Sequence, residues 1–360
     1  MNSDALSSDQ IIEIRKVLNQ QTKNARINSR HKRCLLCDKE GGFCNSHTIP
    51  QFCLENIAWN GKLDSIYTLI DSDLLKKDSG VNNAGTFHII CKPCDSRVFH
   101  GYENEAVYDT FPSQVALTQI ALKTALRDIY KHEAEIELFK GMKQLVKEKA
   151  PLASLFFNVM LDAQIEARTR DIQECYDVFN SSKMHLEAFE SWHRIVSFDK
   201  LNYTSPIAFQ GMVALVTGVN GEIINNIFNH SKKYKLEYLH IAVFPLKHST
   251  AIILFLDSKC KRYKQFEKHL ASLTQEERLE IINKIIFLYT EDYYLSKQLS
   301  ENTIKELEET AKTVQDISTC NPRSSIKAAV RDYDLRRRTH LPNILSEEYQ
   351  VIIENGDKTN

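Results

Sequence analysis

Hydrophobic residues recur at helical spacing in the first and middle parts of the chain. Residues 8–22 predict a first helix, because the apolar residues cluster three or four apart: Ile11, Ile12, Ile14, Val17 and Leu18. Ser113 predicts the N-cap of a long helix whose apolar positions are Val115, Leu117, Ile120, Ala121, Leu122, Ala125 and Ile129. Further helical pattern fills 132–149 and, after Pro151, roughly 152–182.

Near Trp192 the pattern changes to short β-branched and aromatic runs. The segments 240–246 and 250–256 are apolar and separated by three residues, which predicts a hairpin. Helical pattern returns at 263–315, where Thr274 followed by Glu277 predicts a capping box. Three tyrosines within that helical stretch are expected to pack in the core or at an interface: Tyr289, Tyr293 and Tyr294.

These changes in pattern predict an α+β protein. It begins with a segment of short, irregular elements that is rich in Cys, His, Gly and Asn, and it continues as a mainly helical region with an antiparallel β unit. The expected divisions are an N-terminal helix and basic arm (1–30), a cysteine-rich knuckle unit (31–111), a helical region (112–190), a β-rich unit (191–258), and C-terminal helices with a tail (259–360).

Composition sets the expected compartment. The chain of 360 residues is 42% hydrophobic and 26% charged, and it has no apolar run near the ~20 residues that a membrane span requires. The N-terminus lacks the apolar segment of a secretory signal. We therefore expect a cytoplasmic protein with no membrane partner. A net charge of -1 gives no overall nucleic-acid signature, so any basic surface has to be local.

One local basic segment runs from residue 15 to residue 39, where Asp38 is the single acid. Such a segment can lie along phosphates and add salt-sensitive affinity for nucleic acid, or it can be a solvated helix and linker. Both interpretations stay open from the sequence. The candidate phosphate-binding residues are Lys23, Arg26, Arg30, Lys32 and Arg33.

Four of the nine cysteines form two pairs, each with two residues between the thiols. The pairs are Cys34-Cys37 and Cys91-Cys94, and this spacing turns two sulfurs onto one tetrahedral ion. We expect a structural zinc, since four thiolates leave no coordination position for water. The other five have no partner at ligand spacing and are expected in the core: Cys44, Cys53, Cys175, Cys260 and Cys320.

Between and after the knuckles stand Asn45-Ser-His-Thr-Ile-Pro50 and, directly after the last cysteine, Asp95. With the two knuckles, this pattern over residues 31–108 resembles the HNH, or His-Me finger, endonucleases of the zinc-knuckle type. The resemblance implies a treble-clef or ββα-metal finger. It also implies that His47 is the general base, that Asp95 is a ligand of a catalytic divalent cation, and that the four cysteines hold structural zinc.

Two positions depart from that family's pattern. Ser46 stands where the family has a metal-binding Asp, and Thr86 stands where it has an Asn. A cation site for Mg²⁺ or Mn²⁺ would therefore need further ligands beside Asp95. The candidates nearby are His88, His100, Glu103 and Glu105, of which His100 and Glu103 are the expected ones.

Two functions follow as hypotheses. The first is an HNH-like metal-dependent endonuclease that cleaves nucleic acid; DNA is expected over RNA as the partner, and the choice between them stays open from the sequence. The chain is similar to uncharacterised bacterial HNH-like proteins, which implies a role in anti-phage defence or a mobile element. The second is a non-catalytic zinc-binding treble-clef module for nucleic acid or protein. Residues 112–360 carry no recognised catalytic motif, and homo-oligomer formation stays open.

Overall fold

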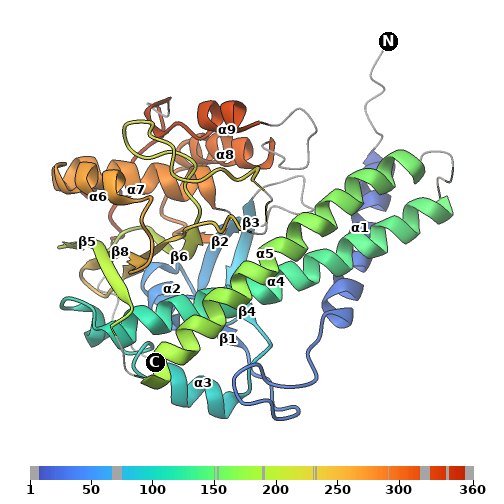
Figure 1. The fold of residues 1–360 in the computed structure, drawn as a ribbon, viewed down its shortest axis with the longest axis horizontal. Helices are drawn as coiled ribbons and strands as arrows, with labels where there is room; N and C mark the ends of the chain where they lie inside the picture. The colour runs from blue at the N-terminus through green and yellow to red at the C-terminus, as the bar shows by residue number, and fades with distance from the viewer. Residues whose placement is uncertain are drawn as a thin grey trace.

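The structure is a computed structural model of the full chain. It describes residues 8–66, 75–149, 151, 154–188, 191–229, 231, 233–290, 292–316, 325–337 and 340–352. The expected core position of Cys320 lies outside these residues. Figure 1 shows a body built around a sheet, with a pair of long helices that extends from it.

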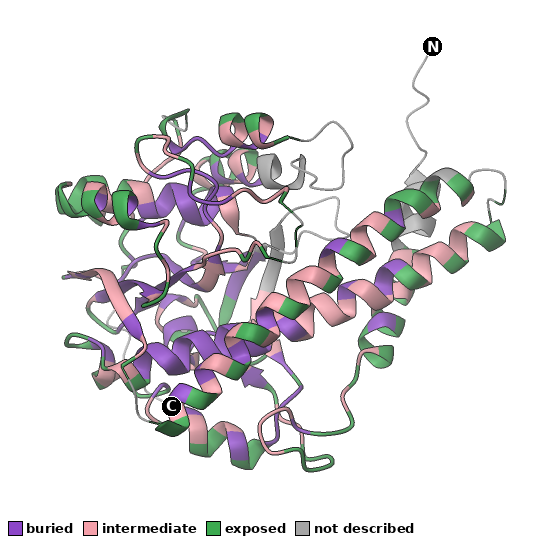
Figure 2. Ribbon diagram, viewed as in Figure 1, coloured by how far each residue is buried: buried purple, intermediate pink, exposed green. Residues whose placement is uncertain are grey.

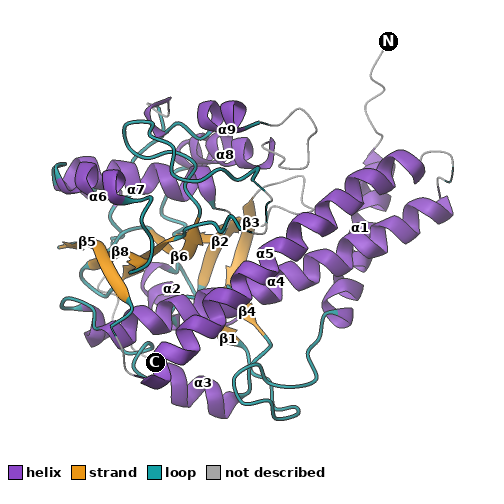
Figure 3. Ribbon diagram, viewed as in Figure 1, coloured by secondary structure: helices purple, strands orange, loops and turns teal. Residues whose placement is uncertain are grey.

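The N-terminal part consists of a helix of 21 residues followed by short elements that loops connect (Figure 3). In chain order they are α1 (Ser8–Asn28), β1 (Ser46–His47), α2 (Gln51–Ile57), β2 (Lys62–Ile66), β3 (Leu75–Gly80), η1 (Val81–Asn83), β4 (Thr86–Phe87), α3 (Lys92–Phe99) and η2 (Glu105–Tyr108). The predicted first helix is confirmed and continues to Asn28.

The remaining elements include the two longest helices of the described residues. They are α4 (Gln114–Lys149), α5 (Ser154–Ala188), β5 (His193–Leu201), β6 (Ile207–Val213), β7 (Leu239–Pro245), β8 (Thr250–Asp257), α6 (Lys264–Ala271), α7 (Gln275–Tyr289), β9 (Tyr293–Leu295), α8 (Glu301–Asp316), α9 (Ile326–Asp332), η3 (Leu335–Arg337) and η4 (Glu347–Tyr349). The helices α4 and α5 pack along each other, and α1 lies against α4 (Figure 1).

Two predicted helix caps are present. The Ser113 hydroxyl accepts a hydrogen bond of 3.2 Å from the backbone N–H of Ala116 at the start of α4. Thr274 and Glu277 form the reciprocal capping box of α7. These contacts satisfy backbone donors that a helix leaves without an intrahelical partner at its first turn.

A seven-stranded sheet forms the centre, in the order β3-β2-β9-β6-β7-β8-β5, and each neighbouring pair is antiparallel. The predicted hairpin is confirmed as β7 and β8, with Leu246 and Ser249 joined at its turn. Strands β2 and β3 lie within 31–111 and join this same sheet. The α+β class is therefore confirmed.

Both faces of the sheet are covered, which explains why β7 is buried along its whole length. Ile241 and Val243 point into a core shared with the C-terminal helices. Ala242 and Phe244 point to the other side, into a core shared with α4 and the residues around β1, β4 and α3. In Figure 2 the central strands of the sheet and the adjoining part of α4 are largely buried, whereas β5 is mostly intermediate. The finger segment and α4 therefore share one hydrophobic core.

One expectation for the C-terminal half is wrong. The helical pattern of 263–315 is interrupted, because Tyr293 and Tyr294 lie in β9 between β2 and β6. Both side chains are buried, and pairing on both edges of the short strand holds it extended. Among the described helices, none is long and apolar enough to span a bilayer.

Candidate metal centre and active site

The four knuckle cysteines come together in space. The Sγ atoms of Cys34, Cys37, Cys91 and Cys94 all lie within 4.8 Å of one another, although 53 residues separate the two pairs in the sequence. Among the described residues, no other set of three or more His, Cys, Asp or Glu side chains meets this distance. The four sulfurs are therefore placed to bind one metal ion such as zinc.

Backbone hydrogen bonds shape each knuckle. In the first, Asp38 donates to the carbonyl of Cys34 over 2.8 Å and has a positive φ of 57°, which closes a tight turn. In the second, Cys91 is the N-cap of α3, and Pro93 lies in the first helical turn, where its missing N–H has no cost. A bridge between Phe43 and Cys91 holds the two knuckles side by side.

The donor set fits a zinc ion. Each of the eight described cysteines is a free thiol, and the knuckle sulfurs lie on buried or half-buried residues. Burial raises the pKa values of Cys34 and Cys94, so both would stay protonated beside neutral neighbours. A bound cation removes these protons and gives the thiolates that zinc requires.

His47 follows Ser46 on β1, which pairs antiparallel with β4. Its Nε2 lies 3.1 Å from the backbone carbonyl oxygen of Val81. Since a carbonyl oxygen can only accept, Nε2 carries the hydrogen, and Nδ1 of the neutral ring is left as a proton acceptor. Burial lowers the pKa of His47, and the charge of Lys123 lowers it further, while the hydrogen bond to Val81 and the charge of Asp95 act in the opposite direction. The neutral ring is the form that a general base needs.

Asp95 lies in the first turn of α3 and is partly exposed, with 26% of its side chain accessible. Its Oδ1 accepts two hydrogen bonds, one from Ser46 Oγ and one from Lys123 Nζ, each of 2.7 Å. Ser46 is fully buried. Ser46, which stands where the family has a metal-binding Asp, therefore donates a hydrogen bond to Asp95, the expected cation ligand.

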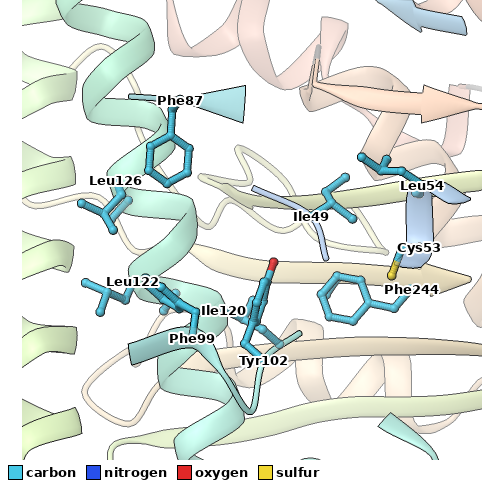
Figure 4. Packing of buried hydrophobic residues seen from close by; sticks show 14 of the residues in the cluster. Ile49, Cys53, Leu54, Phe87, Phe99, Tyr102, Ile120, Leu122, Leu126 and Phe244 are labelled. Carbon is cyan, nitrogen blue, oxygen red and sulfur yellow. The ribbon is translucent and has the colours of Figure 1, made fainter. Parts of the chain in front are cut away.

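Lys123 comes from α4 and has no exposed side-chain surface. Its ammonium lies 4.0 Å from the ring centroid of Phe99, 5.5 Å from that of Tyr102 and 5.9 Å from that of Phe87. Figure 4 shows these three rings packed beside α4 residues such as Leu122 and Leu126. Aromatic faces and a carboxylate both attract a cation, which compensates for the loss of water around this buried charge.

Four other residues are candidate cation ligands: Glu103, His100, Glu105 and His88. Glu103 lies in the turn after α3, where its Oε1 is 3.8 Å from Lys123 Nζ and its Oε2 accepts from the backbone of Gln51. Burial raises the pKa of Glu103. His100 is exposed at the end of α3, and Glu105 accepts from the backbone of Lys247. His88 is exposed, with its ring near that of Tyr130.

These residues fit a catalytic Mg²⁺ or Mn²⁺ poorly. Such ions need several oxygen ligands in near-octahedral order, and part of that shell is usually water. Here Asp95 Oδ1 already accepts from Ser46 and Lys123. An ammonium stands between the two carboxylates, and three aromatic rings also lie near it. No catalytic step is therefore assigned to a divalent ion.

The basic segment begins on α1, which packs against α4, and continues through the loop before the first knuckle. Its five candidate residues are exposed: Lys23, Arg26, Arg30, Lys32 and Arg33. Arg33 is paired with Asp38 at 3.0 Å and lies 3.8 Å from Glu40. Burial lowers the pKa of His88, and the charges of Arg30 and Arg26 lower it further, so these two cations act on the residue that follows β4.

Comparison with known proteins supplies no relative. No protein-family model matches the chain, and neither a curated protein nor a solved structure matches it. The function therefore has to be argued from the site itself. The groups that determine the chemistry of this site are the imidazole of His47, the carboxylate of Asp95 and the ammonium of Lys123.

Sequence reasoning did not find Lys123, although a signal for it exists. Between Gln114 and Leu126 it is the single charged residue, in a helix segment that is otherwise apolar or neutral. Residues 116–126 are all buried in the structure. A lone charge in a buried segment requires a partner of opposite sign nearby, and here that partner is Asp95.

Proposed function

We propose that the protein is a nuclease of the HNH, or His-Me finger, kind. Three features support a ββα-metal finger: the antiparallel pair β1 and β4, the helix α3 that begins at the second knuckle, and the four clustered sulfurs. A zinc ion held by these sulfurs would fix the end of β4 and the start of α3 relative to β1. That arrangement holds His47 and Asp95 in one small region.

The observation that carries the proposal is the hydrogen bond from His47 Nε2 to the Val81 carbonyl. It sets the tautomer and the ring orientation, as the orienting partner of a catalytic histidine does. Nδ1 then takes a proton from water, and the water oxygen attacks phosphorus. The bond between phosphorus and the leaving sugar oxygen breaks, the leaving oxygen takes a proton from solvent, and His47 returns its proton to solvent.

The basic arm supplies affinity in this proposal. Exposed lysine and arginine side chains bind backbone phosphates without reading sequence, so they favour nucleic acid as the substrate. Arg30 and Lys32 are exposed, and they lie directly before the first knuckle. A strand bound along the arm would pass close to the finger that carries His47.

A cleavage assay tests the function. Zinc-loaded protein is incubated with plasmid, single-stranded DNA and RNA, each with added Mg²⁺, with added Mn²⁺ and in metal-free buffer. We expect cleavage that His47→Ala abolishes. His88→Ala is the matched control, because His88 is an exposed histidine close to the same strands and should leave cleavage unchanged. Cleavage that survives in His47→Ala contradicts the assigned base.

A second function is favoured by the ion pair of Lys123 and Asp95. Because the ammonium already neutralises the carboxylate, the finger also suits a non-catalytic module that binds nucleic acid or protein. In that case wild-type protein binds nucleic acid in a salt-dependent manner and cleaves none of the three substrates under any metal condition. Retained binding without cleavage therefore supports the module over the nuclease.

A further inference from the structure

The surroundings of the Lys123 ammonium are built by the finger segment. Phe87 comes from β4, Asp95 and Phe99 come from α3, and Tyr102 and Glu103 come from the turn that follows. Two carboxylates and three aromatic rings thus face one point. The cation at that point is supplied by α4, which lies outside the knuckle segment.

This cage suits an ammonium better than a metal ion. A hydrated dication gains little from an aromatic face compared with oxygen ligands, whereas an ammonium is attracted to such faces and donates hydrogen bonds to carboxylates. Lys123 Nζ is 4.0 Å from the Phe99 centroid and 2.7 Å from Asp95 Oδ1. A dication at the same place would also meet the positive charge of Lys123 at contact distance.

Ser46 completes this arrangement. A carboxylate at residue 46 would be the third beside this one ammonium, after Asp95 and Glu103, and its negative charge would not be balanced. The serine hydroxyl instead donates to Asp95 Oδ1, the oxygen that also accepts from Lys123. Ser46 and Lys123 therefore suit each other. A neutral hydrogen-bond donor at residue 46 leaves Asp95 with a single negative charge, which the ammonium of Lys123 can balance without a metal ion.

We propose that Lys123 takes the place of the divalent cation at Asp95, so that this site works without Mg²⁺ or Mn²⁺. The proposal deepens the proposed function, on which it rests for the role of the site. Lys123 is a positioning residue: with its ammonium fully buried, it holds the Asp95 carboxylate and places a positive charge near His47. Because Lys123 belongs to α4, the carboxylates of Asp95 and Glu103 in the finger depend on that helix for a positive charge.

The test measures metal binding and does not depend on cleavage. Zinc-loaded wild-type protein and Asp95→Asn are titrated with Mn²⁺, and free Mn²⁺ is followed by electron paramagnetic resonance. We expect the two titrations to superimpose, because wild-type Asp95 is already occupied. A Mn²⁺ site that is present in wild type and lost in Asp95→Asn overturns the proposal, whether or not the protein is a nuclease.

A second measurement uses the cavity that Lys123→Ala leaves. We expect a lower Tm in this variant, and we expect n-propylammonium to raise that Tm while Mg²⁺ does not. Lys140→Ala is the control, since Lys140 lies on the same helix and is largely exposed beside Glu137. Rescue by Mg²⁺ but not by the alkylammonium contradicts the proposal. If Lys123→Ala fails to fold, the comparison of wild type with Asp95→Asn still decides it.

Cleavage assays then separate this proposal from the proposed function. Cleavage that depends on His47 and is equal in metal-free buffer and in Mg²⁺ supports both. Cleavage that requires Mg²⁺ and is lost in Asp95→Asn supports the nuclease and overturns the role of Lys123. Absence of cleavage together with superimposed Mn²⁺ titrations overturns the nuclease and leaves Lys123 as the cation of a binding module.

Discussion

Ser46 donates a hydrogen bond of 2.7 Å from its hydroxyl to the carboxylate of Asp95, across 49 residues of sequence. The two residues lie on β1 and in the first turn of α3, so the bond joins the strand that carries His47 to the helix that follows the second knuckle. Lys123 binds the same carboxylate oxygen. The chemistry of the site therefore depends on which residue stands at position 46.

Ser46→Asp should destabilise the protein. The substitution buries another carboxylate beside Asp95, although the one ammonium already faces both Asp95 and Glu103, and an uncompensated buried charge costs about 3 kcal/mol. Thermal unfolding measures the loss. Ser46→Asn is the control, because it has the size of aspartate without its charge. Equal Tm values for the two variants would contradict the charge argument.

Removal of a knuckle cysteine should release the metal. We expect one tightly held zinc ion per chain, and we expect Cys34→Ser and Cys94→Ser to lose it and to unfold the finger. Structural zinc contributes about 10 kcal/mol or more to folding in small zinc units. Metal content by mass spectrometry and circular dichroism give the two measurements.

Cys44→Ser is the matched control for the zinc experiment. Cys44 lies outside the four-sulfur cluster, and its thiol donates to the carbonyl of Ile90, a bond that a serine hydroxyl can replace. This variant should keep its zinc and its fold. Zinc loss from Cys44→Ser as complete as from Cys34→Ser would show that the assigned ligand set is incorrect.

The pH dependence of cleavage should report the lowered pKa of His47. Because burial disfavours the charged ring, the neutral form persists below the ordinary histidine pKa of 6.5. We expect kcat/KM to fall on the acid side with a midpoint below pH 6.5, since that profile reports the free enzyme. An acid midpoint at or above 6.5 would mean that His47 is not the group that titrates.

The basic arm should contribute separately from the site. Arg30→Ala and Lys32→Ala should each weaken nucleic-acid binding and reduce the slope of log K against log salt by about 0.9 for each lost contact with duplex DNA. Arg33→Ala should have a smaller effect, because Arg33 is paired with Asp38 and lies near Glu40. An unchanged salt slope in all three variants would remove the arm from the interface.

Local sequence was enough for features that neighbouring residues decide. Two residues between cysteines set the knuckles, and the clustering of Cys34 with Cys91 followed because one ion needs four donors. The caps at Ser113 and Thr274 were also predictable, since a side chain three residues away satisfies the first backbone donors of a helix. The β7–β8 hairpin followed from two apolar runs around a short loop.

Long-range packing decided the rest. Tyr293 and Tyr294 belong to a strand because β2 and β6 supply hydrogen bonds on both of its edges, which no short-range pattern contains. Lys123 is a buried cation because α4 packs its apolar side onto the finger and the sheet, and the lysine lies within that side. Sequence by itself identified the four cysteines that could hold a metal ion and the candidate base. Only the tertiary structure decided which charge stands beside Asp95, since a helix brings a residue to a distant carboxylate only through the contacts of the folded core.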